Sequence, residues 1–182
     1  MTNIVYLTGF MTCGKSTIGP ILANVLGWNF YDLDKVIESN FGMKITEIFE
    51  LHGEKYFREI ETEHLERLSG KKNVVIALGG GAMANDINVN IMNNAGKIIY
   101  LKIEPLTVYG RIKNKIDRPI FKDLVLGEQS KEVFLEKIQN MMNARETFYS
   151  KADLIIHADN QAVGKVVDEI ANKLKKILNE NS

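Results

Sequence analysis

The sequence predicts an α/β fold, a three-layer αβα sandwich in which helices cover both faces of a parallel sheet. Short apolar runs rich in β-branched residues alternate along the chain with longer amphipathic segments. Strands joined through helices run parallel, because each right-handed crossover carries the chain back to the start of the next strand. The 182 residues contain no internal repeat and no linker rich in Pro, Gly or Ser, so we expect a single domain over residues 1–182.

Each element is indicated by its own local pattern. The candidate strands are the apolar runs at residues 4–7, 29–31, 74–78, 97–103 and 154–156. Helical spacing of apolar residues predicts helices at residues 15–26, 35–41, 54–68, 106–115 and 130–148, and a final helix from about 163 to 178. Ligands of parallel sheets bind beyond the carboxyl ends of the strands, so the loops after these strands are where chemistry is expected.

Composition and charge exclude several classes of protein. Lys plus Arg and Asp plus Glu number 23 each, which gives no support for general binding to nucleic acid or to a membrane surface. No apolar run approaches the roughly 18 residues of a membrane span, and the N-terminus lacks a basic leader. The single cysteine, Cys13, excludes an internal disulfide and a zinc site built from cysteines. We expect a cytoplasmic protein without a nucleic-acid or membrane partner.

The strongest motif is a phosphate-binding loop. Residues 9–16, GFMTCGKS, match G-x-x-x-x-G-K-[ST] between a predicted strand and a predicted helix. The glycines let main-chain N–H groups converge on phosphate oxygens, Lys15 supplies a cation, and the Ser16 hydroxyl can bind Mg²⁺. The alternative is a chance match in a turn, but a lysine at a helix N-terminus opposes the helix dipole unless an anion binds there. The loop predicts nucleotide binding without naming a reaction.

Two aspartates follow the second strand candidate. Asp32 and Asp34 are two residues apart, so on an extended chain both side chains point the same way. One can then face a metal ion and the other a substrate hydroxyl. The alternative is structural, with Asp34 as the N-cap of the next helix and Asp32 as a surface turn residue.

Further candidates are charged residues and glycines. Arg58 and Glu61 are spaced to pair on a helix, where an exposed salt bridge is the plain alternative. Residues 79–81 are three glycines directly after a buried strand, which suits the close approach of a ligand to the main chain and also suits a simple turn.

Two more arginines stand later in the chain. Arg118 precedes a proline in a polar stretch between helices, where a mobile loop can close over a nucleotide. Arg145 lies on a long predicted helix, four residues before Tyr149. A solvent-exposed position is the alternative for both arginines.

Taken together, these residues resemble the shikimate kinases over nearly the whole chain. The matching pieces are the GKST loop, Asp32-x-Asp34, TEIF at residues 46–49, GE-x-x-FR-x-x-E at residues 53–61, the triple glycine, Arg118-Pro119 and Arg145-x-x-x-Tyr149. The GKST loop is shared with all P-loop kinases. The stretch from Glu47 to Glu61, followed by the triple glycine, singles out this family.

The resemblance implies a P-loop NTPase type of fold with a five-stranded parallel sheet in the order 2-3-1-4-5. It implies a kinase that transfers the γ-phosphoryl group of ATP to the 3-hydroxyl of shikimate, giving shikimate 3-phosphate and ADP in aromatic amino acid (chorismate) biosynthesis. Mg²⁺ is the implied cofactor, ATP and shikimate are the partners, and a monomer is expected. The alternative is a P-loop kinase of another small polyol or sugar acid, such as gluconate.

On the nucleotide side, the resemblance implies that Lys15 and Arg118 stabilise charge on the transferring phosphoryl group. Ser16 would bind Mg²⁺ directly and Asp32 through water, and residues 113–124 would form the moving lid. Shikimate kinases commonly have glycine at position 12, so Thr12 requires backbone angles that suit a β-branched residue. The implied nucleotide-binding residues are Thr12, Cys13, Gly14, Lys15, Ser16, Thr17 and Arg118.

On the acceptor side, the implied substrate-binding segment is residues 33–61. Asp34 would hold the acceptor hydroxyls and help to deprotonate the attacking one. Arg58, oriented by Glu61, would grip the carboxylate together with Arg145, and two glycines would contact substrate through their main chain. The implied substrate-binding residues are Asp34, Arg58, Gly80, Gly81 and Arg145.

Overall fold

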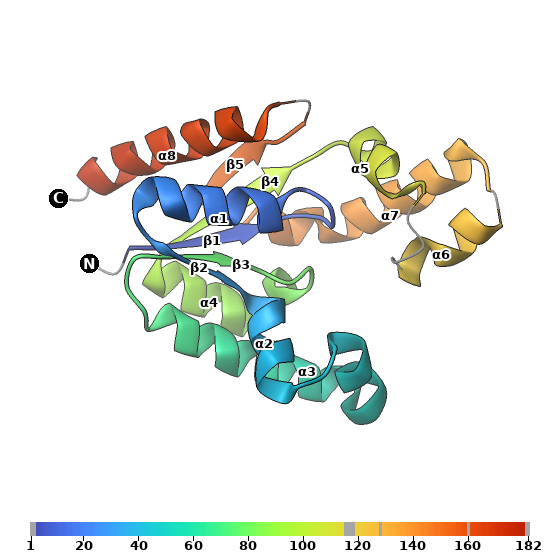
Figure 1. Ribbon diagram of the computed structural model, residues 1–182, viewed down its shortest axis with the longest axis horizontal. Helices are drawn as coiled ribbons and strands as arrows, with labels where there is room; N and C mark the ends of the chain where they lie inside the picture. The colour runs from blue at the N-terminus through green and yellow to red at the C-terminus, as the bar shows by residue number, and fades with distance from the viewer. Residues whose placement is uncertain (1–2, 115–118, 128, 160, 181–182) are drawn as a thin grey trace.

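The computed structural model describes residues 3–114, 119–127, 129–159 and 161–180 and has helices on both faces of one parallel sheet (Figure 1). The sheet has five strands in the order β2-β3-β1-β4-β5, as predicted. The strands are β1 Ile4–Thr8, β2 Asn29–Asp32, β3 Val74–Ala77, β4 Lys97–Lys102 and β5 Leu154–His157. The helices are α1 Lys15–Leu26, α2 Leu33–Phe41, α3 Ile45–Ser69, α4 Asp86–Ala95, α5 Pro105–Ile112, α6 Pro119–Leu126, α7 Lys131–Tyr149 and α8 Val163–Glu180, with a short 3₁₀ turn, η1, at Ala82–Ala84.

The central strand β1 contributes side chains to the cores on both faces of the sheet. All five of its residues are buried, and Val5 is level with Val75 of β3 on one side and with Lys97 of β4 on the other. Successive side chains of a strand point to opposite faces, so Val5 and Leu7 enter the core under α1 and α8 while Ile4 and Tyr6 enter the core under α3 and α4. A strand buried on both faces reads as a continuous apolar run, which is the pattern of this segment.

Three helical segments differ from the prediction made from the sequence pattern. Helix α4 is rich in asparagine, a weak helix former, and it begins where the Asn85 side chain accepts a hydrogen bond from the N–H of Ile87. Helix α3 starts nine residues before the predicted position, at Ile45, and contains a kink at Gly53, whose φ of 81° is left-handed. Helix α6 lies largely within the segment expected to form a lid.

Two predictions made from the sequence concern a membrane span and the lid. In the ranges that the structure describes, no helix is long and apolar enough to cross a membrane. Arg118 and part of the expected lid, residues 115–118, lie outside the described residues. The role predicted for Arg118 therefore stays a prediction.

Candidate active site

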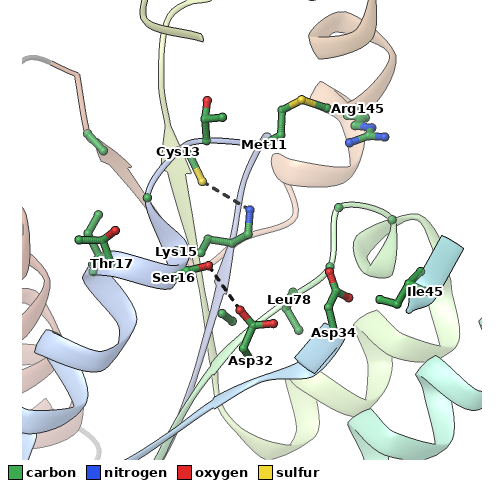
Figure 2. Close-up of a pocket in the computed structure, with 18 of the residues that line it drawn as sticks. Met11, Cys13, Lys15, Ser16, Thr17, Asp32, Asp34, Ile45, Leu78 and Arg145 are labelled. Atoms are coloured by element: carbon green, nitrogen blue, oxygen red, sulfur yellow. Dashed lines mark hydrogen bonds between the residues drawn. The ribbon is translucent and has the colours of Figure 1, made fainter. Parts of the chain in front are cut away.

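A cleft of about 690 Å³ lies at the carboxyl ends of the strands (Figure 2). Its walls come from the phosphate-binding loop, the β2–α2 junction, α3, the loop after β3, and helices α5, α7 and α8. Segments far apart in sequence thus meet where parallel sheets bind ligands. The predicted site residues that line it are Thr12, Cys13, Gly14, Lys15, Ser16, Thr17, Asp32, Asp34, Arg58, Glu61, Gly80, Gly81 and Arg145.

The phosphate-binding loop has left-handed backbone at both of its glycines and at Thr12. A Cβ at Gly9 would lie 2.6 Å from the carbonyl oxygen of Leu101, so only glycine fits there. Thr12 has φ 63°, an angle that a β-branched residue adopts only with strain. Its hydroxyl is buried without a hydrogen-bond partner in the described structure, and Arg111 donates to its carbonyl oxygen at 2.5 Å. The requirement stated for Thr12 is therefore not met, because its angles do not suit a β-branched side chain.

Lys15 opens α1 and bends back over the loop. Its ammonium group donates to the carbonyl oxygens of Gly9 at 2.8 Å and Phe10 at 3.4 Å, and it lies 3.6 Å from the sulfur of the buried Cys13 (Figure 2). The two carbonyl partners are neutral. The lysine charge at the positive end of α1 is thus held at the cleft, where a phosphate group can replace the carbonyl contacts.

The Ser16 hydroxyl lies 3.4 Å from a carboxylate oxygen of Asp32 (Figure 2). The other oxygen of Asp32 accepts a hydrogen bond from the N–H of Lys35 and caps α2. The alternative with Asp34 as the N-cap is therefore wrong, since Asp34 lies within the first turn of α2. The reasoning from an extended chain is also wrong, because the helix begins between the two aspartates; both nevertheless line the cleft.

Asp34 lies in a strongly unfavourable environment for a negative charge. Burial raises the pKa of its carboxyl group from the ordinary 3.8 to about 6, and the nearby carboxylates of Asp32 and Glu61 add to the effect, while Lys15 acts against it. A carboxyl group with this pKa is largely ionised at neutral pH yet basic enough to accept a proton. Its position facing Lys15 across the cleft, seen in Figure 2, suits a general base.

The three glycines after β3 each leave room for a different charged side chain. A Cβ at Gly79 would lie 2.5 Å from an oxygen of Asp34, and a Cβ at Gly80 would lie 3.1 Å from a nitrogen of Arg145. A Cβ at Gly81 would lie 2.6 Å from both terminal nitrogens of Arg58. The loop is therefore more than a turn, because its bare main chain packs directly against the three side chains predicted to bind the acceptor.

Arg58 and Glu61 form an ion pair across one turn of α3. The distance is 2.9 Å, and the Glu61 side chain is only 1% exposed, so the alternative of an exposed surface pair is wrong. Burial raises the pKa of Glu61 and the Arg58 guanidinium counteracts the rise. Arg58 also pairs with the exposed Glu54 at 3.1 Å. With a carboxylate on each side, the guanidinium is held in one orientation at the cleft wall.

Arg145 reaches the same cleft from α7. Its guanidinium lies 5.7 Å from the centre of the Phe10 ring, which is within the range of a cation–π contact. The solvent-exposed alternative for Arg145 is therefore not what the structure shows. Arg58 and Arg145 pack against neighbouring glycines, so two arginines from helices far apart in sequence approach one segment of the glycine loop.

Sequence reasoning missed a second group of cleft residues. Arg111, the single charged residue of α5, lines the cleft, but no motif in the sequence marks it as a site residue. Ala158 and Gln161 follow β5, and Val163 and Val166 belong to the first turn of α8. The rule that ligands bind beyond strand ends would have found Ala158 and Gln161, because the sequence pattern predicts β5 correctly.

Comparisons with known proteins identify the family of this chain. Residues 11–175 match the family model described as shikimate kinase. A shikimate kinase from Chlorobaculum parvum is 40% identical over 174 residues, which cover 96% of this chain and 93% of that protein. Among solved structures, the shikimate kinase from Bacteroides thetaiotaomicron has a TM-score of 0.82 at 30% identity, covering 94% of this chain and 98% of that chain.

Two other solved structures are similar to this chain. The shikimate kinase from Acinetobacter baumannii in complex with shikimate has a TM-score of 0.78 at 30% identity, covering 100% of this chain and 96% of that one. A gluconokinase from Sinorhizobium meliloti has a TM-score of 0.60 at 13% identity and shares the fold alone, covering 99% of this chain and 97% of that one. With the family model spanning most of its length, this chain belongs to the shikimate kinase family.

Proposed function

We propose that this chain transfers the γ-phosphoryl group of ATP to the 3-hydroxyl of shikimate through the cleft residues described above. The observation that carries the proposal is the arrangement around the glycine loop, where Asp34, Arg58 and Arg145 all pack against main chain that has no side chain of its own. A small acid with several hydroxyl groups needs arginines for its carboxylate and one base for its reacting hydroxyl. The phosphate-binding loop on the opposite wall supplies the donor site.

On the donor side, we propose that the main-chain N–H groups of residues 12–17 bind the phosphates of ATP. Lys15 exchanges its contact with the Gly9 carbonyl for phosphate oxygens and neutralises their charge. Arg118 adds positive charge from the lid. Phosphoryl transfer depends mostly on positioning and charge neutralisation, so these cations make the main electrostatic contribution.

The Ser16 hydroxyl and the Asp32 carboxylate fit a magnesium ion. Both are hard oxygen donors and lie 3.4 Å apart beside the phosphate-binding loop. No cluster of three or more His, Cys, Asp or Glu side chains that could hold a metal occurs in the described part of the chain, which agrees with an ion that takes its remaining ligands from phosphate and water. Mg²⁺ bound there would neutralise charge on the phosphate oxygens, with Ser16 as a direct ligand and Asp32 acting through water.

On the acceptor side, Arg58 and Arg145 bind the carboxylate of shikimate, and Gly80 and Gly81 contact the ring through their main chain. Asp34 accepts a hydrogen bond from the reacting hydroxyl and takes its proton as the oxygen attacks the phosphorus atom. The raised pKa of Asp34 supports this role, because a carboxylate that is costly to keep ionised gains most from taking a proton.

The test is Mg·ATP turnover, measured by coupled ADP release with shikimate, with gluconate and without an acceptor. We expect ADP release that depends on shikimate, is absent with gluconate, and falls by about two to four powers of ten in Asp34→Asn. Glu59→Gln removes an exposed carboxylate from the same part of the protein and is the matched control, expected to keep wild-type turnover. Turnover with gluconate but none with shikimate would refute the assignment of the acceptor site, and so would full activity in Asp34→Asn.

A further inference from the structure

Asn88 is a buried polar residue that none of the assigned roles explains. It lies in α4, and its side chain is 0% exposed. A carboxamide in an apolar core costs free energy unless its donor and its acceptor are both paired. The core around it contains apolar neighbours such as Val89 and Met92 of the same helix. A polar group at this place needs a specific reason.

Both ends of the Asn88 carboxamide are paired, and the two partners belong to different elements. Its nitrogen donates to the carbonyl oxygen of Ala82 at 3.1 Å. Its oxygen accepts from the hydroxyl of Thr62 on α3 at 2.7 Å. The Thr62 hydroxyl also accepts from the side chain of Asn85 at 3.2 Å. Asn88 thus connects η1, which directly follows the glycine loop, to helix α3.

The two ends of this connection flank the contact between Arg58 and Gly81. Ala82 is the residue after Gly81, and the Arg58 guanidinium packs so closely on Gly81 that an added Cβ would lie 2.6 Å from its terminal nitrogens. Thr62 lies one turn after Arg58 on α3, and its hydroxyl is also 3.0 Å from the Arg58 carbonyl oxygen. Two hydrogen bonds in series, Ala82 to Asn88 and Asn88 to Thr62, therefore link the end of the glycine loop to α3, beside the direct bond from Asn85 to Thr62.

We propose that Asn88 is a positioning residue for the acceptor, which acts with Thr62 to hold the glycine loop at the distance from α3 that lets Arg58 and Gly81 bind the acceptor together. This inference rests on the function proposed above and adds a residue to it. Asn88 touches neither substrate, because it lies behind the loop in the core. We therefore expect its effect to be confined to the acceptor half of the cleft.

An apolar side chain of similar size cannot replace this connection. It would leave the Ala82 carbonyl without its donor, in a buried place where an unpaired group is costly. The loop would then shift to find another partner, and a small shift matters because Gly81 and Arg58 are already in close contact. The donor site rests on β1 and α1, which this change does not touch.

The experiment measures steady-state kinetics of the full chain with shikimate and ATP varied separately. In Asn88→Leu we expect the KM for shikimate to rise about tenfold, with kcat less affected and the KM for ATP within about twofold of wild type. Val89→Ala is the matched control, since it removes a core side chain from the next position of α4. It is expected to lower thermal stability and leave the KM for shikimate unchanged.

A second pair of variants tests the other end of the connection. Thr62→Val keeps the shape of the side chain without the hydroxyl and should raise the KM for shikimate, whereas Thr62→Ser keeps the hydroxyl and should restore it. Because the hydrogen bonds act in series, the double variant Asn88→Leu with Thr62→Val should be no worse than the more impaired single variant.

The inference is overturned if folded Asn88→Leu has the wild-type KM for shikimate, if Val89→Ala raises that KM equally, or if Thr62→Ser behaves like Thr62→Val. Should Asn88→Leu fail to fold, the Thr62 pair decides the question alone. A wild-type protein without shikimate-dependent turnover would instead refute the proposed function, so the two failures are distinguishable.

Discussion

Replacing Asp34 by asparagine should make the protein more stable while it loses activity. The carboxyl group of Asp34 has its pKa raised from 3.8 to about 6, first by burial and then by the charges of Asp32 and Glu61. Folding therefore disfavours the ionised form. The amide of asparagine has nearly the same shape and carries no charge, so the substitution removes the cost of burying the charge and little else.

The sign and the size follow from the two pKa values. Well below the ordinary pKa of 3.8 the group is protonated in the folded and the unfolded chain, and folding carries no penalty from it. The penalty grows as pH rises and is complete above the folded pKa of about 6. One pKa unit corresponds to about 1.4 kcal/mol, so Asp34→Asn should raise the free energy of unfolding by up to about 3 kcal/mol at pH 8 and by about half as much at pH 5.

Urea unfolding followed by tryptophan fluorescence measures the free energy of unfolding of the wild-type protein and of Asp34→Asn. The chain has a single tryptophan, Trp28, which packs against the core and reports its loss. The control is Glu59→Gln, whose carboxylate is exposed and whose removal should change stability little at either pH. An unfolding free energy for Asp34→Asn that equals the wild-type value at pH 8, or a gain that does not shrink at pH 5, would refute the reasoning.

Three further predictions follow from the same contacts. The kcat/KM of the wild-type protein should fall as pH drops through about 6, because Asp34 becomes protonated and cannot accept the proton; a profile flat from pH 5 to 8 would contradict its role as base. Gly81→Ala should raise the KM for shikimate more than about tenfold, since the added Cβ meets Arg58 at 2.6 Å, whereas Gly110→Ala, with open space around it, should not; equal kinetics would contradict the packing. Thr12→Gly should raise the free energy of unfolding by about 1 kcal/mol, because it relieves a left-handed φ of 63° and removes an unpaired buried hydroxyl, and a thermal melt with a lower midpoint would speak against strain.

The strands and the phosphate-binding loop could be predicted because their signals are local. A strand buried on both faces is apolar at nearly every position, as in β1, and a positive φ in a phosphate-binding loop favours glycine, as at Gly14. Helices α4 and α6 could not be predicted in the same way. Helix α4 has weak intrinsic propensity and is stabilised by tertiary contacts with α3 and η1.

In the candidate site, too, the local sequence predicts some properties of single residues and tertiary contacts decide the others. Arg58 and Glu61 are spaced to pair on any helix, but whether that pair is exposed or buried depends on what covers α3. The local pattern allows Asp34 as an N-cap, yet the helix begins earlier because Asp32 accepts the N–H of Lys35. Arg111 carries no local signal at all, since its place in the cleft depends on how α5 lies against the phosphate-binding loop.

The sequence by itself determined the fold class and the family, because these depend on periodicity and on motifs that act over a few residues, and the order of the strands followed from the resemblance to that family. Only the tertiary structure decided which charge each glycine of residues 79–81 accommodates and why the pKa of Asp34 is raised. The same holds for Asn88, whose buried amide is explained only once Ala82 and Thr62 are seen on either side of it. Burial and the electrostatics that follow from it are set by neighbours distant in the chain, and no local pattern records them.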